Sequence, residues 1–234
     1  MKHTPLFLYD LLVKFFGEQD WWPVDHVYHK NHGSDPCFEV IVGAILTQNT
    51  AWSNVEKALE QLKRHDMLSA HALAQTPDYE LESLIQSSGY FNQKAARLKQ
   101  VSTYLLDTYQ GDLSRLFSKD LSATREELLS LKGIGPETAD SILLYAGHLP
   151  IFVVDAYTKR LCKRIPLDVP SLSYNDVQKY FQQNIQQQIP LNRLTYIYQQ
   201  FHALIVELAK QYCTTKPKCL ICPLRTHCLF QQTL

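Results

Sequence analysis

Apolar residues recur at spacings of three and four positions along most of this chain, which is the period of an amphipathic helix. The segments that show this pattern are residues 6–16, 38–46, 55–62, 95–109, 139–145 and 196–209. Glycine, proline and short polar stretches separate them, and the alternating pattern of a half-buried strand is scarce. The spacing therefore predicts an all-α protein.

The chain has 234 residues, enough for one substantial core or two modest domains. Its longest apolar stretch, residues 41–46, is too short to cross a bilayer. Asp10, Lys14 and Glu18 interrupt the N-terminal segment, so it does not resemble a signal peptide. We expect a soluble, cytoplasmic and monomeric protein without a membrane partner. The formal net charge is zero, so affinity for nucleic acid has to come from local basic patches and aimed backbone groups.

Four of the six cysteines lie in the last 22 residues, as Cys213, Cys219, Cys222 and Cys228. Because the chain shows no secretory signal, this Cys-x5-Cys-x2-Cys-x5-Cys pattern favours metal binding over disulfides. Four thiolates in a short loop bind either a tetrahedral zinc ion or an iron–sulfur cluster, and the pattern alone does not choose between them. We expect the other two cysteines, Cys37 and Cys162, to be unreactive core thiols.

A second run of metal-binding residue types consists of His26, His29 and His32, with the spacing His-x2-His-x2-His. The run closely follows two tryptophans, and no partner ligand is evident beside it. We therefore interpret it as a solvated connection and not as a metal site.

Residues 131–140 have the sequence Leu-Lys-Gly-Ile-Gly-Pro-Glu-Thr-Ala-Asp and join two predicted helices. The first helix starts with Thr124 and Glu127 at capping-box spacing, and the second begins with a proline at a favoured position. Gly133 and Gly135 let the backbone turn tightly with positive φ and approach a ligand closely. Free amides at the start of the second helix then form an anion site suited to a phosphate, although an ordinary αα-hairpin has the same elements.

Asp155 follows an apolar run and is placed to cap the helix that begins after it. Together, the hairpin and residues 153–155 resemble the catalytic core of the endonuclease III superfamily of helix-hairpin-helix DNA glycosylases. Glu137 and Asp155 are 18 positions apart, which is the separation of that family's two catalytic positions. The resemblance extends through residues 48–50 and 88–95 to the C-terminal cysteines.

The resemblance implies two helical domains with a cleft between them. Residues 34–149 would form one domain, which ends in the helix-hairpin-helix. Residues 1–33 and 150–234 would form the other, which holds the cysteine loop. In that superfamily the loop carries a [4Fe–4S] cluster, although its first spacing is usually one residue longer. We therefore expect a [4Fe–4S] cluster here, with zinc as the alternative.

The resemblance also implies that Asp155 is the catalytic carboxylate. Breaking an N-glycosidic bond develops positive charge on the sugar, which a fixed anion stabilises while it orients or deprotonates the attacking water. Bifunctional members have a lysine at the second catalytic position, which forms a Schiff base and permits strand cleavage. This chain has Glu137 there, which predicts hydrolysis without a lyase step, although Lys132 and Lys159 lie nearby in the sequence. Glu137 would position water, or would only favour the helix dipole from its first turn.

All three tryptophans fall in two short segments, with Trp21 and Trp22 before Pro23, and with Trp52 further on. Together with residues 47–50, residues 89–95 and Glu137, the Trp-Trp-Pro segment most resembles the bacterial 3-methyladenine DNA glycosylase III branch, whose matching aromatic positions line the base pocket. Stacking holds a flipped base, and indole faces attract the cationic ring of a purine methylated at N3 or N7. Some members of that branch have a lysine where this chain has Leu204. The alternative is that the tryptophans pack as hydrophobic plugs.

A set of DNA contacts follows from the same resemblance. Gln48 and Asn49 stand where the superfamily places the residue that fills the gap left by the flipped base, although polar residues also commonly end a helix. The other expected DNA contacts are Lys132, Gly133, Gly135, Thr138, Lys216, Lys218 and Arg225. The last three would offset the neutral overall charge as a phosphate-contacting patch, or would simply be solvated.

The sequence thus predicts a monofunctional DNA glycosylase of base excision repair that is associated with the nucleoid. It would act on double-stranded DNA containing damaged bases and remove alkylated purines of the 3-methyladenine type. Three alternatives remain open: a bifunctional glycosylase/AP lyase for oxidised pyrimidines, a mismatch-specific glycosylase, and a non-catalytic lesion-binding iron–sulfur protein.

Overall fold

A computed structural model describes residues 3–230 of the chain. Within those residues it contains thirteen α-helices, four short 3₁₀ or π-helical turns and no β-strand. The predicted all-α fold class is confirmed. In the same residues, no helix combines the length and the apolar character that spanning a membrane requires.

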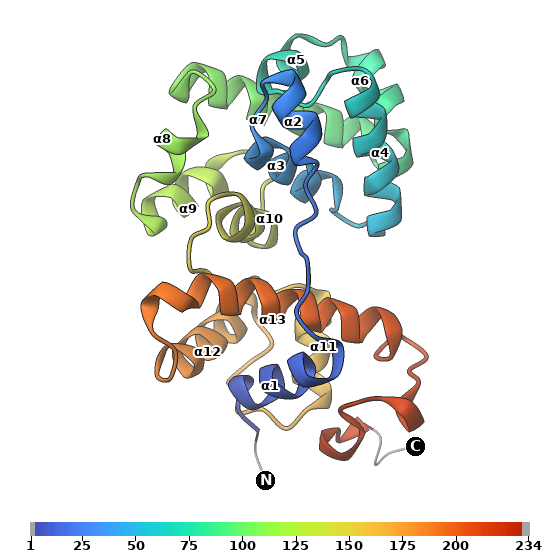
Figure 1. The fold of residues 1–234 in the computed structure, drawn as a ribbon, viewed down its shortest axis with the longest axis vertical. Coiled ribbons are helices and arrows are strands. Elements are labelled where there is room, and N and C mark those ends of the chain that lie inside the picture. The colour runs from blue at the N-terminus through green and yellow to red at the C-terminus, as the bar shows by residue number, and fades with distance from the viewer. Residues whose placement is uncertain (1–2, 231–234) are drawn as a thin grey trace. The chain divides into compact units, whose positions relative to one another are not determined.

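The chain divides into two compact units, whose ribbons are drawn in Figure 1. Unit 1 consists of Met1–Trp21 and Pro150–Leu234, and unit 2 consists of Trp22–Leu149. Residues 22–33 group with unit 2, whereas the sequence-based expectation placed them with the C-terminal part. They do so because helix α2 is tied to the neighbouring helices of unit 2 by buried polar contacts, which are described below.

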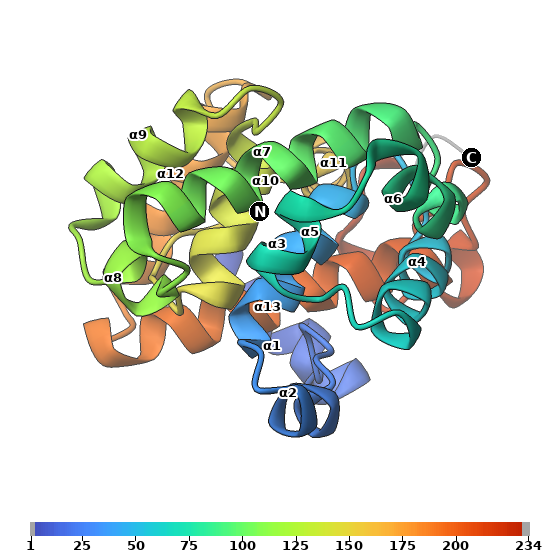
Figure 2. The same cartoon turned by 90° about the horizontal axis from the view of Figure 1, so that it is seen from above.

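Unit 2 is a bundle of helices packed around one buried helix, α3. Its elements are α2 (His26–His32), α3 (Pro36–Leu46), α4 (Trp52–Arg64), α5 (Ala70–Gln75), α6 (Asp78–Leu84), η1 (Gln86–Ser88), α7 (Phe91–Tyr109), α8 (Leu113–Phe117), α9 (Leu121–Ser130), α10 (Pro136–Ser141) and the π-helical turn η2 (Ile142–Ala146). Helix α5 lies alongside the long helix α7 (Figure 2).

Helix α3 is the core of unit 2, with every residue from Phe38 to Leu46 buried. Asp35 caps its start, accepting a hydrogen bond from the Cys37 amide at 2.8 Å, and Pro36 occupies the first turn. A helix that is apolar on nearly all sides has to be enclosed, and α4, α7 and η2 pack around it.

Unit 1 is built from both ends of the chain. Its elements are α1 (Pro5–Phe16), α11 (Ala156–Arg164), α12 (Tyr174–Gln186), α13 (Leu191–Gln211), η3 (Cys219–Ile221) and η4 (Arg225–His227). The long helix α13 packs against α1, α11 and α12. An aromatic group forms the centre, where the Phe152 and Phe181 rings stack at 4.7 Å and Tyr198 and Phe201 pack against Phe152.

The helix before the hairpin starts earlier than predicted. Helix α9 begins at Leu121, and its cap is Asp120, whose side chain accepts hydrogen bonds from the amides of Ser122 and Ala123. The capping box expected at Thr124 and Glu127 is therefore wrong. The apolar pattern of one short helix did not reveal its first turn, because that turn is mostly solvated.

Candidate functional site

Asp155 is the cap of helix α11, as its position after an apolar run predicted. Its Oδ1 atom accepts hydrogen bonds from the Thr158 amide at 2.7 Å and from the Thr158 hydroxyl at 2.8 Å. The preceding residues Ile151 to Val154 are all buried, so the chain carries the carboxylate into the interior, where the residue is 8% exposed. A cap that uses one carboxylate oxygen leaves the second oxygen for another purpose.

That second oxygen faces His202, a residue that the sequence analysis did not select. The His202 Nε2 atom lies 3.6 Å from Asp155 Oδ2, and both side chains are buried. Burial by itself raises the pKa of Asp155, but the imidazole of His202 and the Thr158 hydrogen bonds outweigh it and hold that pKa below the ordinary 3.8. Asp155 is therefore an ionised carboxylate in a largely water-free setting. A histidine on the buried face of a predicted helix is the signal that could have revealed His202.

The hairpin joins α9 to α10 through two glycines with different conformations. Gly133 has φ of 85°, whereas Gly135 has φ of −93° and caps α10. The expectation of positive φ at both glycines is therefore wrong for Gly135. The two helices are held together by Arg125, whose guanidinium donates to both carboxylate oxygens of the fully buried Asp140, at 2.7 and 3.2 Å.

Gln48 and the hairpin are bonded to each other. The Gln48 side-chain amide donates to the Gly133 carbonyl at 3.1 Å and to the Thr138 hydroxyl at 2.9 Å. Its carbonyl accepts from Arg97 Nη1 at 2.5 Å, and the Arg97 side chain covers Gly133 so closely that a Cβ there would lie 2.3 Å from Nε. Arg97 was not predicted as a site residue. The structure brings Gln48, Gly133 and Thr138 together, with Arg97 as the link.

A buried lysine, Lys94, fixes the start of the turn that follows α3. Lys94 is buried, and its ammonium donates to the carbonyls of Leu46 at 2.8 Å and of Ser88 at 2.7 Å. Burial lowers the pKa of Lys94 to about 8, and the charge of nearby Arg97 adds to this effect. Two residues further along the turn from Leu46 comes Gln48, and then the exposed Asn49, whose φ is 54°. The turn is thus anchored while Asn49 faces solvent.

Glu137, predicted as a catalytic residue, and Lys132, predicted as a DNA contact, both lie at the surface. Glu137 is exposed in the first turn of α10, and Lys132 is exposed just before Gly133. Thr138, by contrast, is buried beside Gln48. The structure therefore presents Glu137 and Lys132 to solvent and uses Thr138 inside the hairpin network.

An aromatic cluster forms in unit 2 around Trp22. The Trp22 ring lies edge-on to Trp52, with centroids 5.2 Å apart, and 5.3 Å from the ring of Tyr145. Tyr145 is a buried residue of the π-helical turn η2, a type of turn often found at functional sites, and the sequence analysis missed it. Gly43 lies beneath Trp22, where a Cβ would come within 3.0 Å of the indole. Trp22 and Trp52, predicted from separate segments, are thus brought together.

The other two residues predicted for the base pocket, Trp21 and Pro23, directly precede and follow Trp22 in the sequence. Trp21 belongs to unit 1, where the ammonium of Lys210 lies 5.5 Å from its ring centroid. Pro23 belongs to unit 2 and is exposed. Trp21 is thus assigned to unit 1, whereas the cluster around Trp22 is assigned to unit 2.

The four C-terminal cysteines line one small cavity of about 20 Å³ in unit 1, together with Arg164, Tyr212, Pro217, Arg225 and Phe230. Arg164 Nη1 donates to Cys213 Sγ at 3.0 Å, which places a cation beside one sulfur. Burial raises the pKa of Cys222 to about 11, and the neighbouring sulfurs add to that effect. Within residues 3–230, no three His, Cys, Asp or Glu side chains converge closely enough to hold a single metal ion. The cysteines surround a space instead of meeting at one point.

The basic residues between these cysteines are on the surface. Lys216, Lys218 and Arg225 are all exposed. The loop that presents them is anchored by Leu224, which is 1% exposed. The position of these cations is thus set by the fold of the cysteine loop.

Comparison with known proteins shows that the Gln48 turn, the hairpin and Asp155 lie within one region shared by a protein family. The profile of the HhH-GPD superfamily of base excision DNA repair proteins matches residues 42–187, which include the Gln48 turn, the hairpin and Asp155. The chain belongs to this superfamily. It is accordingly a DNA glycosylase of base excision repair, as the sequence predicted.

Individual relatives of this glycosylase extend the match to nearly the whole chain. It is 40% identical to the protein named "Putative DNA repair glycosylase MJ1434" of Methanocaldococcus jannaschii, over 95% of this chain and 94% of that protein. Its fold resembles H. pylori 3-methyladenine DNA glycosylase (MagIII) bound to 1,N6-ethenoadenine, with a TM-score of 0.69, 29% identity, and coverage of 89% of this chain and 98% of that one. It also resembles endonuclease III in a trapped covalent intermediate with DNA, with a TM-score of 0.75 and 23% identity over 99% and 98% of the chains.

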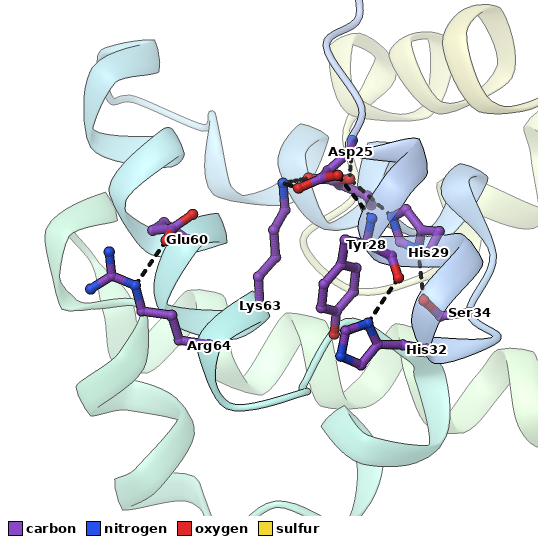
Figure 3. A network of polar contacts seen from close by, with 9 residues as sticks. Asp25, Tyr28, His29, His32, Ser34, Glu60, Lys63 and Arg64 are labelled. Carbon is purple, nitrogen blue, oxygen red and sulfur yellow. Dashed lines mark hydrogen bonds and ion pairs between the residues drawn. The ribbon is translucent and has the colours of Figure 1, made fainter.

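One sequence interpretation is overturned in this glycosylase. The histidine run was expected to be a solvated connection, but it forms helix α2, and His29 is 2% exposed. Its Nε2 lies 2.9 Å from Glu39 Oε2. Its Nδ1 lies 2.7 Å from the hydroxyl oxygen of Ser34, and Figure 3 shows these two side chains facing one another. The sequence did not predict that His29 is buried and paired, because its partner Glu39 lies on an otherwise apolar helix.

Proposed function

We propose that this glycosylase is monofunctional and that it hydrolyses the N-glycosidic bond of alkylated purines of the 3-methyladenine type in double-stranded DNA. The observation that carries the proposal is the buried, ionised carboxylate of Asp155. One of its oxygens is committed to Thr158, and the other lies 3.6 Å from His202 Nε2. This arrangement fixes a negative charge in a defined direction.

Asp155 suits the chemistry of glycosidic bond cleavage. As the base departs, positive charge develops on the sugar, and a preorganised anion stabilises that charge more effectively in a dry site than in water. The same carboxylate can accept a proton from the attacking water. His202 keeps the carboxylate ionised, so that it is ready in both roles.

The hairpin residue Glu137 supports hydrolysis without strand cleavage. A lysine at this position would attack the sugar and form a Schiff base, whereas a carboxylate cannot form that imine. Glu137 is exposed in the first turn of α10, where it can orient water or interact with the helix dipole. A substitute lysine, such as Lys132 or Lys159, is the route by which a lyase activity would arise.

The aromatic cluster supports an alkylated purine as the substrate. Trp22, Trp52 and Tyr145 place three rings within 5.3 Å of a neighbour, a surface suited to stacking a flipped base. A purine methylated at N3 carries a positive charge that attracts it to indole faces and also weakens its glycosidic bond. The relative of known structure with 29% identity is a 3-methyladenine DNA glycosylase holding 1,N6-ethenoadenine.

Binding to DNA is assigned to three surfaces. The hairpin amides at Gly133 and Gly135 would contact phosphates irrespective of sequence. Asn49, exposed beside the anchored Gln48, would enter the space left by the flipped base. The exposed cations of the cysteine loop, Lys216, Lys218 and Arg225, would contact the DNA backbone and make affinity salt-dependent.

The cysteine loop fits a [4Fe–4S] cluster. Such a cluster takes one thiolate at each iron, so it needs four sulfurs around a shared cavity, and Cys213, Cys219, Cys222 and Cys228 provide them. The Arg164 guanidinium beside Cys213 would stabilise the thiolate charge there. When bound, the cluster would supply structural cross-linking of the loop that presents the three cations.

Borohydride trapping on an abasic duplex separates this proposal from a bifunctional enzyme. We expect no covalent adduct with the wild-type chain, together with release of free base from a duplex that contains a single alkylated purine. An adduct would mean that another lysine forms the Schiff base. Base release from oxidised pyrimidines or mismatches alone would replace the substrate class.

A further inference from the structure

Helix α3 contacts the segment from Trp22 to Asp25 through two of its residues, Glu39 and Gly43. Glu39 and Gly43 are four residues apart on this helix and therefore lie on one face. The Glu39 Oε2 atom accepts a hydrogen bond from the Asp25 amide at 2.9 Å. One turn further on, Gly43 leaves just enough room for the Trp22 indole, since a Cβ would lie 3.0 Å from it. The same helix face thus holds both ends of this short segment.

Glu39 is a carboxylate in the core of unit 2, and it pairs with a residue on each of two neighbouring helices. The residue is 1% exposed, and its Oε1 lies 2.8 Å from Lys63 Nζ on α4. His29 Nε2 lies 2.9 Å from the other oxygen, so α2 is attached to the same carboxylate. Burying a carboxylate is unfavourable unless it is fully paired. The hydrogen bonds hold the pKa of Glu39 below its usual value even though burial acts to raise it.

Asp25 completes the attachment of the segment. Its side chain caps α2 by accepting a hydrogen bond from the Tyr28 amide at 2.9 Å, and it also lies 3.4 Å from Lys63 Nζ. Figure 3 shows Lys63 reaching from α4 toward Asp25, with Tyr28 and His29 on the adjacent helix. Three helices therefore converge on the backbone that directly follows Trp22 and Pro23.

We propose that Glu39, with Lys63 and His29, is a positioning group for base excision, because it fixes the Trp22 ring against Trp52 and Tyr145. This inference rests on the proposed function, in which those rings hold the excised base. Glu39 and Lys63 do not touch the base in this account. They act through the Asp25 amide, three residues from Trp22.

The chain offers a matched control for a merely structural ion pair. Arg64 follows Lys63 directly on α4, and its Nε lies 2.8 Å from Glu60 Oε1 in an exposed pair between two residues of α4 itself (Figure 3). Such surface pairs contribute little to stability. Arg64→Met therefore removes a cation from the same helix without affecting the proposed positioning group.

The activity experiment compares Lys63→Met, Glu39→Gln and Arg64→Met in single-turnover base release from methylated duplex DNA. We expect Lys63→Met and Glu39→Gln to lower the release rate by about ten- to a hundredfold, since small misplacements of a binding group have effects of that size. Binding to undamaged duplex should stay unchanged, and Lys63→Arg should restore most of the rate. Arg64→Met should match the wild type. Equal rates for Lys63→Met and Arg64→Met would overturn the proposal.

A second readout does not depend on activity. The chain has three tryptophans, so a sample labelled with 15N-tryptophan has three indole N–H signals. We expect Lys63→Met to move the signals of Trp22 and Trp52 and to leave that of Trp21, whereas Arg64→Met moves none. Unmoved signals in Lys63→Met would refute the positioning role. If Glu39→Gln does not fold, the Lys63→Met variant still provides this test. The Lys63 side chain is 18% exposed, so it is less deeply buried than that of Glu39.

The two readouts keep this inference separate from the proposed function. If the wild type releases no alkylated purine, the proposed substrate is wrong, and the indole signals alone decide whether Glu39 and Lys63 position Trp22. If the wild type is active and the indole signals move, but the release rate of Lys63→Met equals that of the control, the catalytic part of the inference is wrong while the substrate stands.

Discussion

The Oδ2 atom of Asp155 lies 3.6 Å from the Nε2 atom of His202, and both side chains are buried. The pair connects the start of α11 to the middle of α13, within unit 1. Its consequence is electrostatic. Burial alone would raise the pKa of Asp155 and favour its neutral form, and the imidazole of His202 together with the Thr158 hydrogen bonds reverses that tendency. A carboxylate that stays charged in a dry site is what stabilisation of a developing sugar cation requires.

Replacing His202 should change the pH dependence of base release. Asp155 has its pKa below 3.8 in the folded chain, so its charge is present above that range and is lost as the pH falls through the folded pKa. In His202→Gln, burial remains while the imidazole is gone, so the Asp155 pKa should rise. The acidic limb of the single-turnover rate profile should then move to higher pH. The control is His71→Gln, an exposed residue of α5. An acidic limb that stays in place in His202→Gln would contradict the role given to His202.

The two hairpin glycines should differ in their tolerance of a side chain. Gly133→Ala introduces a Cβ at φ of 85°, within 2.3 Å of Arg97 Nε. We expect it to lower the free energy of unfolding by about 1–2 kcal/mol or more and to weaken duplex binding. Gly135→Ala meets no atom within 4 Å and has negative φ, so its stability should stay close to that of the wild type. Thermal unfolding and duplex binding measure both. Equal destabilisation by the two changes would show that the hairpin geometry is not as described.

The cysteine loop should depend on its four sulfurs and not on the other two. Cys222→Ser should lose iron and inorganic sulfide, and its duplex affinity should fall because Lys216, Lys218 and Arg225 are no longer held in place. Cys162→Ser is the matched control, because burial raises the pKa of that thiol to about 12 and leaves it unreactive. Metal and sulfide analysis of the purified chains provides the measurement. Stoichiometric zinc without sulfide in the wild type would replace the cluster with a zinc site.

The aromatic cluster should favour a cationic base over a neutral one. Trp52→Leu keeps an apolar side chain but removes an indole face, so release of the cationic base 3-methyladenine should slow by more than release of a neutral alkylated purine. The expected difference is about 0.5–2 kcal/mol, the range of a cation–π contact. Trp52→Phe should lie between Leu and the wild type. Equal losses for the two lesions would mean that the cluster acts by shape alone.

The sequence was informative for several residues whose roles depend on their neighbours along the chain, although the local pattern misplaced the cap of α9 and the φ angle of Gly135. The helical periods, the cap at Asp155 and the glycine conformation at Gly133 all follow from local patterns. The structure added the residues whose roles depend on distant partners. His202 meets Asp155 from 47 positions away, and Arg97 reaches Gln48 and Gly133 from a different helix. A local pattern can single out one member of such a pair, as the buried face of α13 does for His202, but it does not name the partner.

Buried polar groups were the hardest to predict. Glu39 lies on an apolar helix and His29 in a polar run, so each is unremarkable in its own segment, and only their 2.9 Å contact explains both. Tyr145 was predicted as part of a helix, but the wider π-helical turn that contains it and its approach to Trp22 were not. A single sequence gives the period of an element, whereas the packing of two elements decides which of their polar side chains meet.

Base release from methylated duplex DNA by the wild type and by Asp155→Asn tests the central claim most directly, with strand nicks scored before and after alkali. The account predicts free 3-methyladenine from the wild type only, duplex binding by both proteins, and nicks that appear only after alkali. Release by Asp155→Asn at the wild-type rate, or nicking by the wild type without alkali, would contradict it.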